Sequence, residues 1–196
     1  KVIQAGKANV GDYLLKPFTQ IELKERIDNL LERSRSRKEI DKHLKKAFEQ
    51  IDHGLFLSAK SELELVLDLD PRHDLANRKL GELVSRLHGM EAALPFFKKA
   101  VESNPYQATN HFKLASAYEQ IGLLEKAIAT LTAACSTINF DDELHYRLGA
   151  LLAKKKHEYA AAVKELKAAL EINASHERAS ALLKLLQQQQ IPKGAT

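Results

Sequence analysis

Small residues recur along this chain with a period of 34 residues. The first such column is Ala47, Gly81, Ala115 and Gly149, the second is Ala59, Ala93, Ala127 and Ala162, and the third is Val66, Ala100, Ala134 and Ala169. A small side chain lets two helix backbones approach closely, so three such columns indicate a helix pair that packs in the same way in each unit. The period therefore predicts an all-α array of about four helix-turn-helix repeats.

The boundaries of the units are marked by turn residues. The second and third columns slip to a spacing of 35 residues in the last unit, so one extra residue lies between Gly149 and Ala162, in the polar stretch 154–158. Prolines follow Asp70 and Asn104 between units, where they end one helix and orient the next. Turns inside the units are expected at 53–54, 88–89, 122 and 155–157.

Each unit also carries a more detailed pattern. In the third unit Leu114, Ala115, Tyr118 and Ile121 recur at helical spacing, Gly122 interrupts them, and Ala127, Leu131 and Ala134 continue the pattern. A Leu before a small residue, an Ala opening the second helix, an aromatic or Leu four positions on and a closing Pro resemble tetratricopeptide (TPR) repeats. The resemblance covers residues 40–176 in four repeats, and it implies a TPR superhelix. Residues 177–190 are expected to form the capping helix, and residues 191–196 a disordered tail.

This chain departs from the TPR pattern at two places. His43, Asn77, His111 and His145 stand where the family often has Trp, and Lys46 stands where Leu is usual in the first unit. These departures weaken the expected packing of the first repeat more than they weaken the resemblance to TPR repeats.

Residues 1–33 do not join the repeat. Residues 11–18 form a strand-like run that ends in Lys-Pro-Phe, and Thr19 begins an amphipathic helix marked by Ile21, Leu23, Ile27, Leu30 and Leu31. This order resembles the last strand and helix of a two-component response regulator receiver domain, an α/β fold. The resemblance implies that Lys16 contacts the phosphoryl group, that Tyr13 changes rotamer on phosphorylation, and that Pro17 follows a cis peptide bond. The phosphoacceptor comes from earlier strands of that fold, so residues 1–33 are interpreted as the truncated remnant of a receiver.

An orphan strand and helix cannot bury both of their faces. We expect the helix from Thr19 to about Arg33 to lie against the first repeat, and it can also run on through Ser34 to Arg37 into the next helix. Pairing of the exposed strand with a second copy would instead give a homodimer through the N-terminal remnant.

Charge is concentrated in one segment. The net charge is +4 and the pI is about 9.0, but residues 33–46 alone carry seven basic and two acidic side chains. A basic linker at 34–39 on a near-neutral array is a poorer indication of nucleic-acid binding than a basic stripe on a folded face. No apolar run approaches the roughly 18 residues of a membrane span. The single Cys135 is expected to be a small core residue, and the chain to be cytoplasmic.

No constellation of catalytic or cofactor-binding residues is recognisable. Phosphate-binding glycine loops, paired cysteines and zinc-protease motifs are absent from the sequence. We therefore expect no enzyme activity, cofactor or metal site. His43, His111 and His145 share one column and are interpreted as packing positions, while His157 and His176 are expected in solvated loops.

The resemblance to TPR proteins implies a concave binding surface on the first helix of each pair. The candidate groove residues by register are Leu44, Phe48, Arg78, Lys79, Glu82, Phe112, Lys113, Glu119, Tyr146 and Arg147. A row of apolar and aromatic side chains with an arginine is typical of a peptide-binding surface, and the flanking cations would attract an acidic ligand. In TPR proteins that bind chaperones, two asparagines hold the C-terminal carboxylate of the ligand. Phe48 and Lys79 stand at those two positions here, so the resemblance disfavours a chaperone C-terminus as the ligand.

These observations favour a bacterial signalling protein in which a receiver is joined to a TPR output module. Its expected work is binding a partner protein or peptide, under control of receiver phosphorylation within a phosphorelay. The alternative is a structural or oligomerisation scaffold whose groove is filled by its own or a neighbouring helix. A DNA-binding regulator that uses the basic linker is the third and least favoured class.

Overall fold

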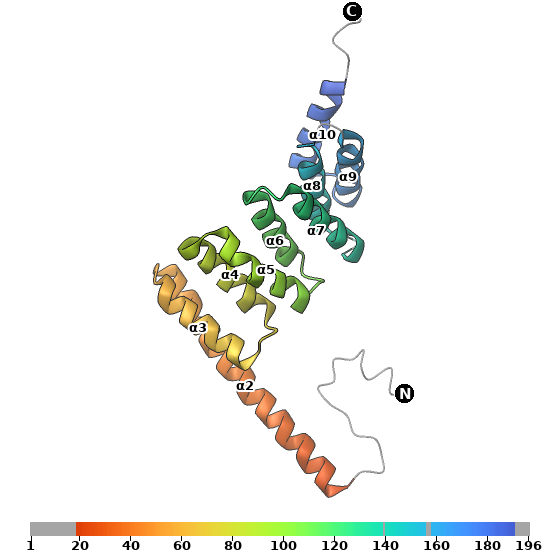
Figure 1. Cartoon of the computed structure of the whole chain (residues 1–196). Helices are drawn as coiled ribbons and strands as arrows, with labels where there is room; N and C mark the ends of the chain where they lie inside the picture. The colour runs from red at the N-terminus through yellow and green to blue at the C-terminus, as the bar shows by residue number, and fades with distance from the viewer. Residues whose placement is uncertain (1–18, 139, 156–157, 191–196) are drawn as a thin grey trace, which may run out of the picture. The chain divides into compact units, whose positions relative to one another are not determined.

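The computed structural model describes residues 19–138, 140–155 and 158–190, and all regular secondary structure in these ranges is helical (Figure 1). The chain divides into two compact units, residues 1–71 and residues 72–196. The expected strand at 11–18, with Tyr13, Lys16 and Pro17, lies outside the described residues, as does the expected tail at 191–196. Residues 1–33, which we interpreted from the sequence as a receiver remnant, are therefore described only from Thr19 onward.

The first unit is a helical hairpin. Helix α2 (Gln20–Asp52) and helix α3 (Phe56–Leu69) pack against each other through their ends nearest the connecting turn. The buried residues of this hairpin are Leu44, Ala47, Ala59, Leu63 and Val66. The N-terminal half of α2 extends beyond α3 (Figure 1). The core of the first repeat is thus confined to the C-terminal half of α2.

Helix α2 begins at a capping box. The Thr19 hydroxyl accepts a hydrogen bond from the backbone N–H of Glu22 (3.2 Å), and the Glu22 carboxylate accepts one from the backbone N–H of Thr19 (2.6 Å). These bonds satisfy amides that have no partner inside the helix. The helix therefore begins where its sequence predicts.

The remainder of α2 differs from our main expectation. It continues without a break through residues 34–39, where we expected a basic linker, so the helix that begins at Thr19 does run into the next expected helix. Residues 19–39 are all exposed, including Ile21 at 72% and Leu31 at 52%. The expected packing of this segment against the first repeat is wrong, because a continuous helix carries it away from α3.

The second unit contains the remaining helices. They are α4 (Asp74–His88), α5 (Met90–Ser103), α6 (Ala108–Gln120), α7 (Leu124–Thr137), α8 (Asp142–Leu152), α9 (Tyr159–Ile172) and α10 (Glu177–Gln190). Helices α4 and α5, α6 and α7, and α8 and α9 pack as successive pairs, and α10 packs against α9 and α8. Gly89 (φ 92°) separates α4 from α5 and Gly122 (φ 80°) separates α6 from α7, as the turn pattern predicts. Residues 156 and 157 of the last expected turn lie outside the described residues.

The three columns of small residues are all buried, which confirms the repeat register. Every member of the second and third columns has 0% exposure. At Gly149 an added Cβ would lie 2.9 Å from Cγ of Leu166 and 3.2 Å from the carbonyl oxygen of Ala162. Helices α8 and α9 therefore approach so closely that a side chain at position 149 would force its neighbours to shift. None of the described helices is long and apolar enough to cross a membrane.

Candidate functional site

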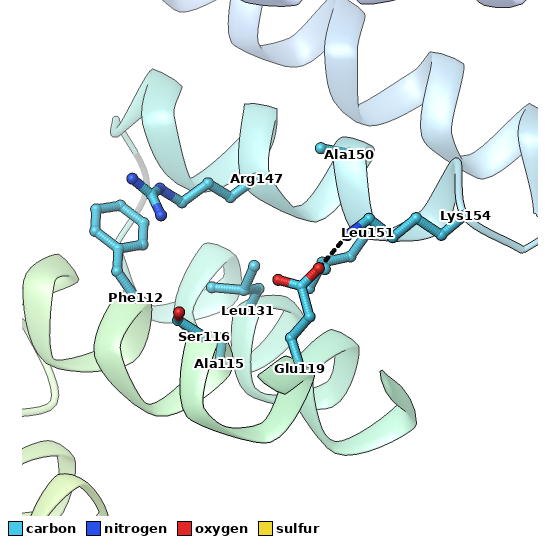
Figure 2. Close-up of a pocket in the computed structure, with 9 residues that line it drawn as sticks. All are labelled: Phe112, Ala115, Ser116, Glu119, Leu131, Arg147, Ala150, Leu151 and Lys154. Atoms are coloured by element: carbon cyan, nitrogen blue, oxygen red, sulfur yellow. Dashed lines mark hydrogen bonds and ion pairs between the residues drawn. The ribbon is translucent and has the colours of Figure 1, made fainter. Parts of the chain in front are cut away.

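A pocket of about 140 Å³ lies in the second unit between α6 and α8 (Figure 2). Its walls are formed by Phe112, Ser116 and Glu119 of α6 and by Arg147, Ala150 and Lys154 of α8 and the turn after it. Its floor is formed by Ala115, Leu131 and Leu151. The repeat places these side chains together because α6 and α8 are first helices of successive pairs and present the same face.

One end of the pocket is an aromatic ring covered by a cation. The guanidinium carbon of Arg147 lies 4.5 Å from the centroid of the Phe112 ring, within the range of a cation–π interaction. Nε of Arg147 donates a hydrogen bond to Oε1 of Glu143 at 2.6 Å, which holds the guanidinium in place. Both Phe112 and Arg147 remain partly exposed. A ligand at this end would meet an apolar ring edge and a positive charge together.

The other end of the pocket is closed by an ion pair between Lys154 and Glu119. The two side chains are 56% and 35% exposed, so the pair lies at the surface. Between the two ends the walls carry only Ser116 and Ala150, whose small side chains leave the space open (Figure 2). The pocket is therefore apolar in its middle and charged at both ends.

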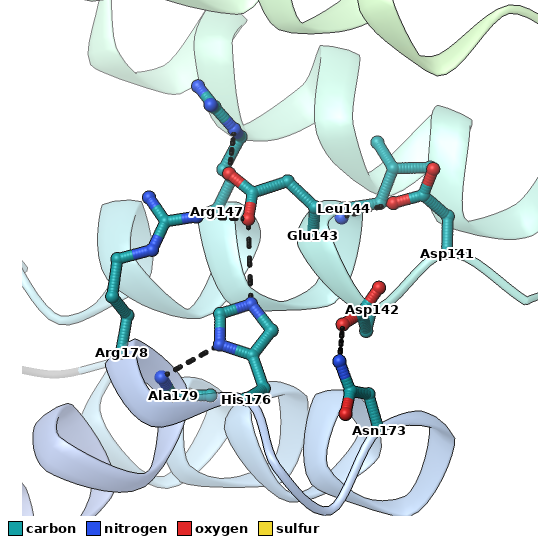
Figure 3. A network of polar contacts seen from close by, with 9 residues as sticks. All are labelled: Asp141, Asp142, Glu143, Leu144, Arg147, Asn173, His176, Arg178 and Ala179. Atoms are coloured by element: carbon teal, nitrogen blue, oxygen red, sulfur yellow. Dashed lines mark hydrogen bonds and ion pairs between the residues drawn. The ribbon is translucent and has the colours of Figure 1, made fainter.

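Tyr146, the next aromatic residue after Phe112 among the candidate groove residues, has a similar environment. The guanidinium carbon of Arg178 lies 4.7 Å from the centroid of the Tyr146 ring, and the rings of Tyr146 and His176 are 4.9 Å apart. Nη2 of Arg178 donates to Oε2 of Glu143 at 2.6 Å, so Glu143 binds both arginines (Figure 3). The capping helix thereby contributes directly to the surface that carries the aromatic row.

His176 is buried, which overturns our expectation that it lies in a solvated loop. Its Nδ1 accepts a hydrogen bond from the backbone N–H of Ala179 (3.2 Å), so His176 acts as the N-cap of α10. Its Nε2 lies 3.5 Å from Oε2 of Glu143. Histidine is an uncommon N-cap, which is why the sequence pattern did not identify this role. His157 lies outside the described residues.

Helix α4 adds a second charged cluster. Glu82 accepts hydrogen bonds from Lys79 (2.9 Å) and from Lys113 of α6 (2.8 Å). Burial raises the pKa of Glu82, but the bonds from Lys113 and Lys79 together outweigh it and hold the pKa below its ordinary value. Nε of Arg78 donates to Oδ1 of the buried Asn110 at 3.1 Å, a neutral partner.

These clusters contain more cations than carboxylates. The cations are Arg78, Lys79, Lys113, Arg147, Lys154 and Arg178, and the carboxylates are Glu82, Glu119 and Glu143. These nine side chains carry a formal net charge of +3, and Asp74, whose Oδ2 accepts a hydrogen bond from Asn110 at 3.1 Å, reduces it to +2. Positive potential of this kind attracts anionic ligands and speeds their association.

The candidate residues from the first unit have different surroundings. Leu44 is buried in the hairpin core and Phe48 is half-buried, both on α2. The helix at 20–33, which we expected to lie against the first repeat, is part of α2 itself and does not fold over them. Phe112, Glu119 and Arg147 do lie around one pocket. Lys154 and Arg178 were missed, because one follows the end of α8 and the other belongs to the capping helix outside the repeat register.

The histidine column has varied partners. Nδ1 of His43 lies 2.6 Å from Glu62, and Nδ1 of His145 lies 2.8 Å from Glu165. Nε2 of His111 lies 2.9 Å from the carbonyl oxygen of Pro105, and His111 is buried. Around His145 a ligating atom from each of Cys135, His145 and Glu165 lies within 4.8 Å of the other two. Within the described parts of the chain this is the group that could hold a metal ion.

Comparison with known proteins agrees with the repeat pattern. Residues 108–138, which span α6 and α7, match the family model described as tetratricopeptide repeat. A comparison with curated protein sequences found no significant match.

Several solved structures resemble this one. The crystal structure of MamA is 21% identical, covers 77% of this chain and 82% of its own, and gives a TM-score of 0.64. YrrB, described as a TPR protein with an unusual peptide-binding site, is 20% identical with coverages of 72% and 73% and a TM-score of 0.58. A tetratricopeptide repeat protein from Parabacteroides merdae is 22% identical with coverages of 78% and 61% and a TM-score of 0.66. At these identities the likeness shows the fold, which is that of tetratricopeptide repeat proteins.

Proposed function

We propose that this chain, which has the fold of tetratricopeptide repeat proteins, binds a segment of another protein in the groove between α6 and α8 and catalyses no reaction. The observation that carries the proposal is the pocket itself: a partly exposed Phe112 beside the guanidinium of Arg147, with only Ser116 and Ala150 between them and the ion pair at the far end. A partly exposed aromatic ring next to an arginine is the composition of an interface anchor. The peptide-binding site ascribed to the structurally similar YrrB supports the use of this fold for such a task.

The charge of the groove indicates the class of segment. Glu82, Glu119 and Glu143 are outnumbered by the cations that surround them, so an incoming carboxylate would be attracted and an incoming lysine repelled. Arg147 uses Nε for Glu143, which leaves its terminal nitrogens to meet a ligand carboxylate. The proposed ligand is therefore an acidic segment with one apolar side chain that enters the pocket.

The proposal is tested with a displayed library of short random peptides selected on the full chain. We expect enrichment of peptides with Asp or Glu on either side of an aromatic or aliphatic residue. Affinity for a selected peptide should fall at least tenfold in Arg147→Gln and should weaken as salt is raised. Phe140→Ala is the matched control, because this aromatic side chain is 87% exposed and is not among the pocket residues. Equal binding by Arg147→Gln and Phe140→Ala would exclude the groove as the binding site.

The second candidate is a structural scaffold whose groove is filled by its own chain. The packing of Tyr146 against His176 and Arg178 of the C-terminal capping region favours it at that end of the row. The double variant Phe112→Ala with Tyr146→Ala separates the two functions. A binding groove loses about 2 kcal/mol or more of peptide affinity, roughly 30-fold, with an unchanged melting temperature. If the chain is a scaffold, the double variant should instead have a lower melting temperature or a different mass in solution, with no effect on peptide binding.

We further propose that residues 1–33 are the end of a receiver domain, which would place the array in a bacterial, cytoplasmic two-component signalling protein controlled by phosphorylation. Three features support this: the Lys-Pro-Phe run ending at Phe18, the capped start of α2 at Thr19, and the uncovered apolar side chains on residues 20–31. A receiver sheet would bury that apolar face. An acidic phosphoacceptor pocket should then be encoded upstream of Lys1 in the natural protein. With those residues included, the phosphoryl mimic beryllofluoride should change the affinity of the groove for a selected peptide. An upstream sequence without such a pocket would contradict the proposal.

A further inference from the structure

Three side chains with metal-ligating atoms meet on neighbouring helices of the second unit. Cys135 comes from α7, His145 from α8 and Glu165 from α9. The ligating atoms all lie within 4.8 Å of one another, and each residue is partly exposed. We propose that Cys135, His145 and Glu165 form a binding site for a divalent transition-metal ion, with Zn²⁺ as the best match. This site is separate from the proposed peptide groove and does not depend on it.

The geometry requires only small movements. Zn–S bonds of about 2.3 Å and Zn–N or Zn–O bonds of about 2.0–2.2 Å place tetrahedral ligand atoms roughly 3.3–3.6 Å apart. Nδ1 of His145 and Oε2 of Glu165 are now 2.8 Å apart in a hydrogen bond, so they must separate slightly while the thiol closes in. The side chains of His145 and Glu165 are 17% and 19% exposed, so side-chain rotation can achieve this and the fourth position can be open to water. A thiolate with an imidazole favours Zn²⁺ or Co²⁺ over Mg²⁺ and Ca²⁺.

The first repeat provides an internal comparison. There His43 and Glu62 form the same kind of pair at 2.6 Å, and Lys46 lies 3.5 Å from the Glu62 carboxylate. The pKa of Glu62 is lowered first by its hydrogen bond to His43 and also by Lys46, so a protein cation already compensates that carboxylate. In the fourth repeat Leu148 stands at the position of Lys46, one residue before the small-residue column in each case. Glu165 therefore lacks the lysine that the register places beside Glu62.

Among the four repeats, only the third has a cysteine at the position of Cys135. The residues that follow the third small-residue column are Leu67, Val101, Cys135 and Leu170. An apolar side chain is thus sufficient for packing at this position, since the other repeats use one. The thiol, the imidazole and the carboxylate come together only next to the fourth repeat. Packing at this position therefore does not require a thiol.

The electrostatic environment favours a cation and disfavours a nucleophile. Burial, which is the largest cause, and the nearby carboxylates of Glu165 and Asp141 together raise the pKa of the Cys135 thiol to about 12. A raised pKa is the opposite of what activates a cysteine as a nucleophile. A divalent cation reverses this balance, because it compensates the carboxylates and displaces the thiol proton.

The test is a Co²⁺ titration of the full chain after treatment with a chelator and removal of any purification tag. We expect one equivalent of Co²⁺ to produce thiolate-to-cobalt charge-transfer absorption and visible bands of tetrahedral intensity, and Zn²⁺ to displace it. Cys135→Val, which installs the residue of the preceding repeat, should abolish the charge-transfer band. Glu165→Gln, a change that preserves the shape of the side chain, should weaken affinity at least tenfold. His43→Asn is the matched control and should leave binding unchanged.

Two results would overturn the proposal. One is the lack of a charge-transfer band in the natural sequence with excess Co²⁺ at pH 8. The other is Co²⁺ affinity that survives in Cys135→Val and Glu165→Gln, which would place the ion on other ligands. Circular dichroism of each variant shows whether the helices are retained. The titration of the unchanged chain decides the question even if a variant does not fold.

Discussion

The close approach of α8 and α9 makes a quantitative prediction about Gly149. A Cβ at this position would lie 2.9 Å from Cγ and 3.1 Å from Cδ2 of Leu166, and 3.2 Å from the carbonyl oxygen of Ala162. Leu166 has 0% exposure, so any shift of its side chain takes place inside the core. Gly149→Ala therefore forces the two helices apart or drives Leu166 from its rotamer.

The expected magnitude is a balance of two effects. Replacing glycine by alanine inside a helix stabilises it by about 1 kcal/mol. Overfilling a packed contact costs roughly 1–3 kcal/mol, so Gly149→Ala should have a net cost of up to about 2 kcal/mol. In a Leu166→Ala background, which by itself costs about 2–5 kcal/mol, most of the clash is gone. There Gly149→Ala should be neutral or stabilising by up to about 1 kcal/mol.

The assay is urea denaturation followed by circular dichroism for the parent chain, both single variants and the double variant. The coupling energy between the two positions should be roughly 1–3 kcal/mol, in the direction that makes the double variant more stable than additivity predicts. A coupling energy near zero would show that α8 and α9 do not approach in this way. Stabilisation by Gly149→Ala alone would refute the reasoning equally.

Three further variants test separate parts of the structure. The pKa of Glu82 is lowered on folding, so the ionised carboxylate stabilises the folded chain fully above the ordinary pKa of 4.5, and this stabilisation is lost as the pH falls through the folded-state pKa. Glu82→Gln should therefore reduce the loss of melting temperature on acidification. Thr19→Ala removes the cap of α2 at a local cost of about 1 kcal/mol, so amide exchange should accelerate in the first turn of α2 while the urea midpoint of the second unit stays the same. Asn110→Ala removes donors to the carbonyl oxygens of Ala100 and Asn104 and should lower the free energy of unfolding by about 1–3 kcal/mol; an unchanged urea midpoint would contradict the burial of this side chain.

The helix pairs were predictable because their causes are local or repeated. Small residues at a spacing of 34 specify where backbones approach, and all twelve column positions are buried. Gly89 and Gly122 mark turns because glycine adopts positive φ without steric cost. The start of α2 was predictable from Thr19 and Glu22 for the same reason, since a capping box involves only neighbouring residues.

The candidate site was predictable only in part. The repeat register places Phe112, Tyr146 and Arg147 on related faces of α6 and α8, and the structure finds all three partly exposed there. The register also nominated Leu44, which instead belongs to the core of the first unit. The same position in successive repeats can thus be core or surface, because its burial depends on which neighbours cover it.

The sequence alone determined the period, the helix pairs, most of their turns and the beginning of α2, because each of these depends on residues close together or on a pattern repeated four times. Only the tertiary structure decided which side chains from different repeats meet. The stacking of Arg147 on Phe112 and of Arg178 on Tyr146, and the grouping of Cys135 with His145 and Glu165, join residues up to 35 positions apart. Such contacts depend on the rotation between successive helix pairs and on side-chain rotamers, which are set by packing across helices rather than by the spacing of residues along one chain.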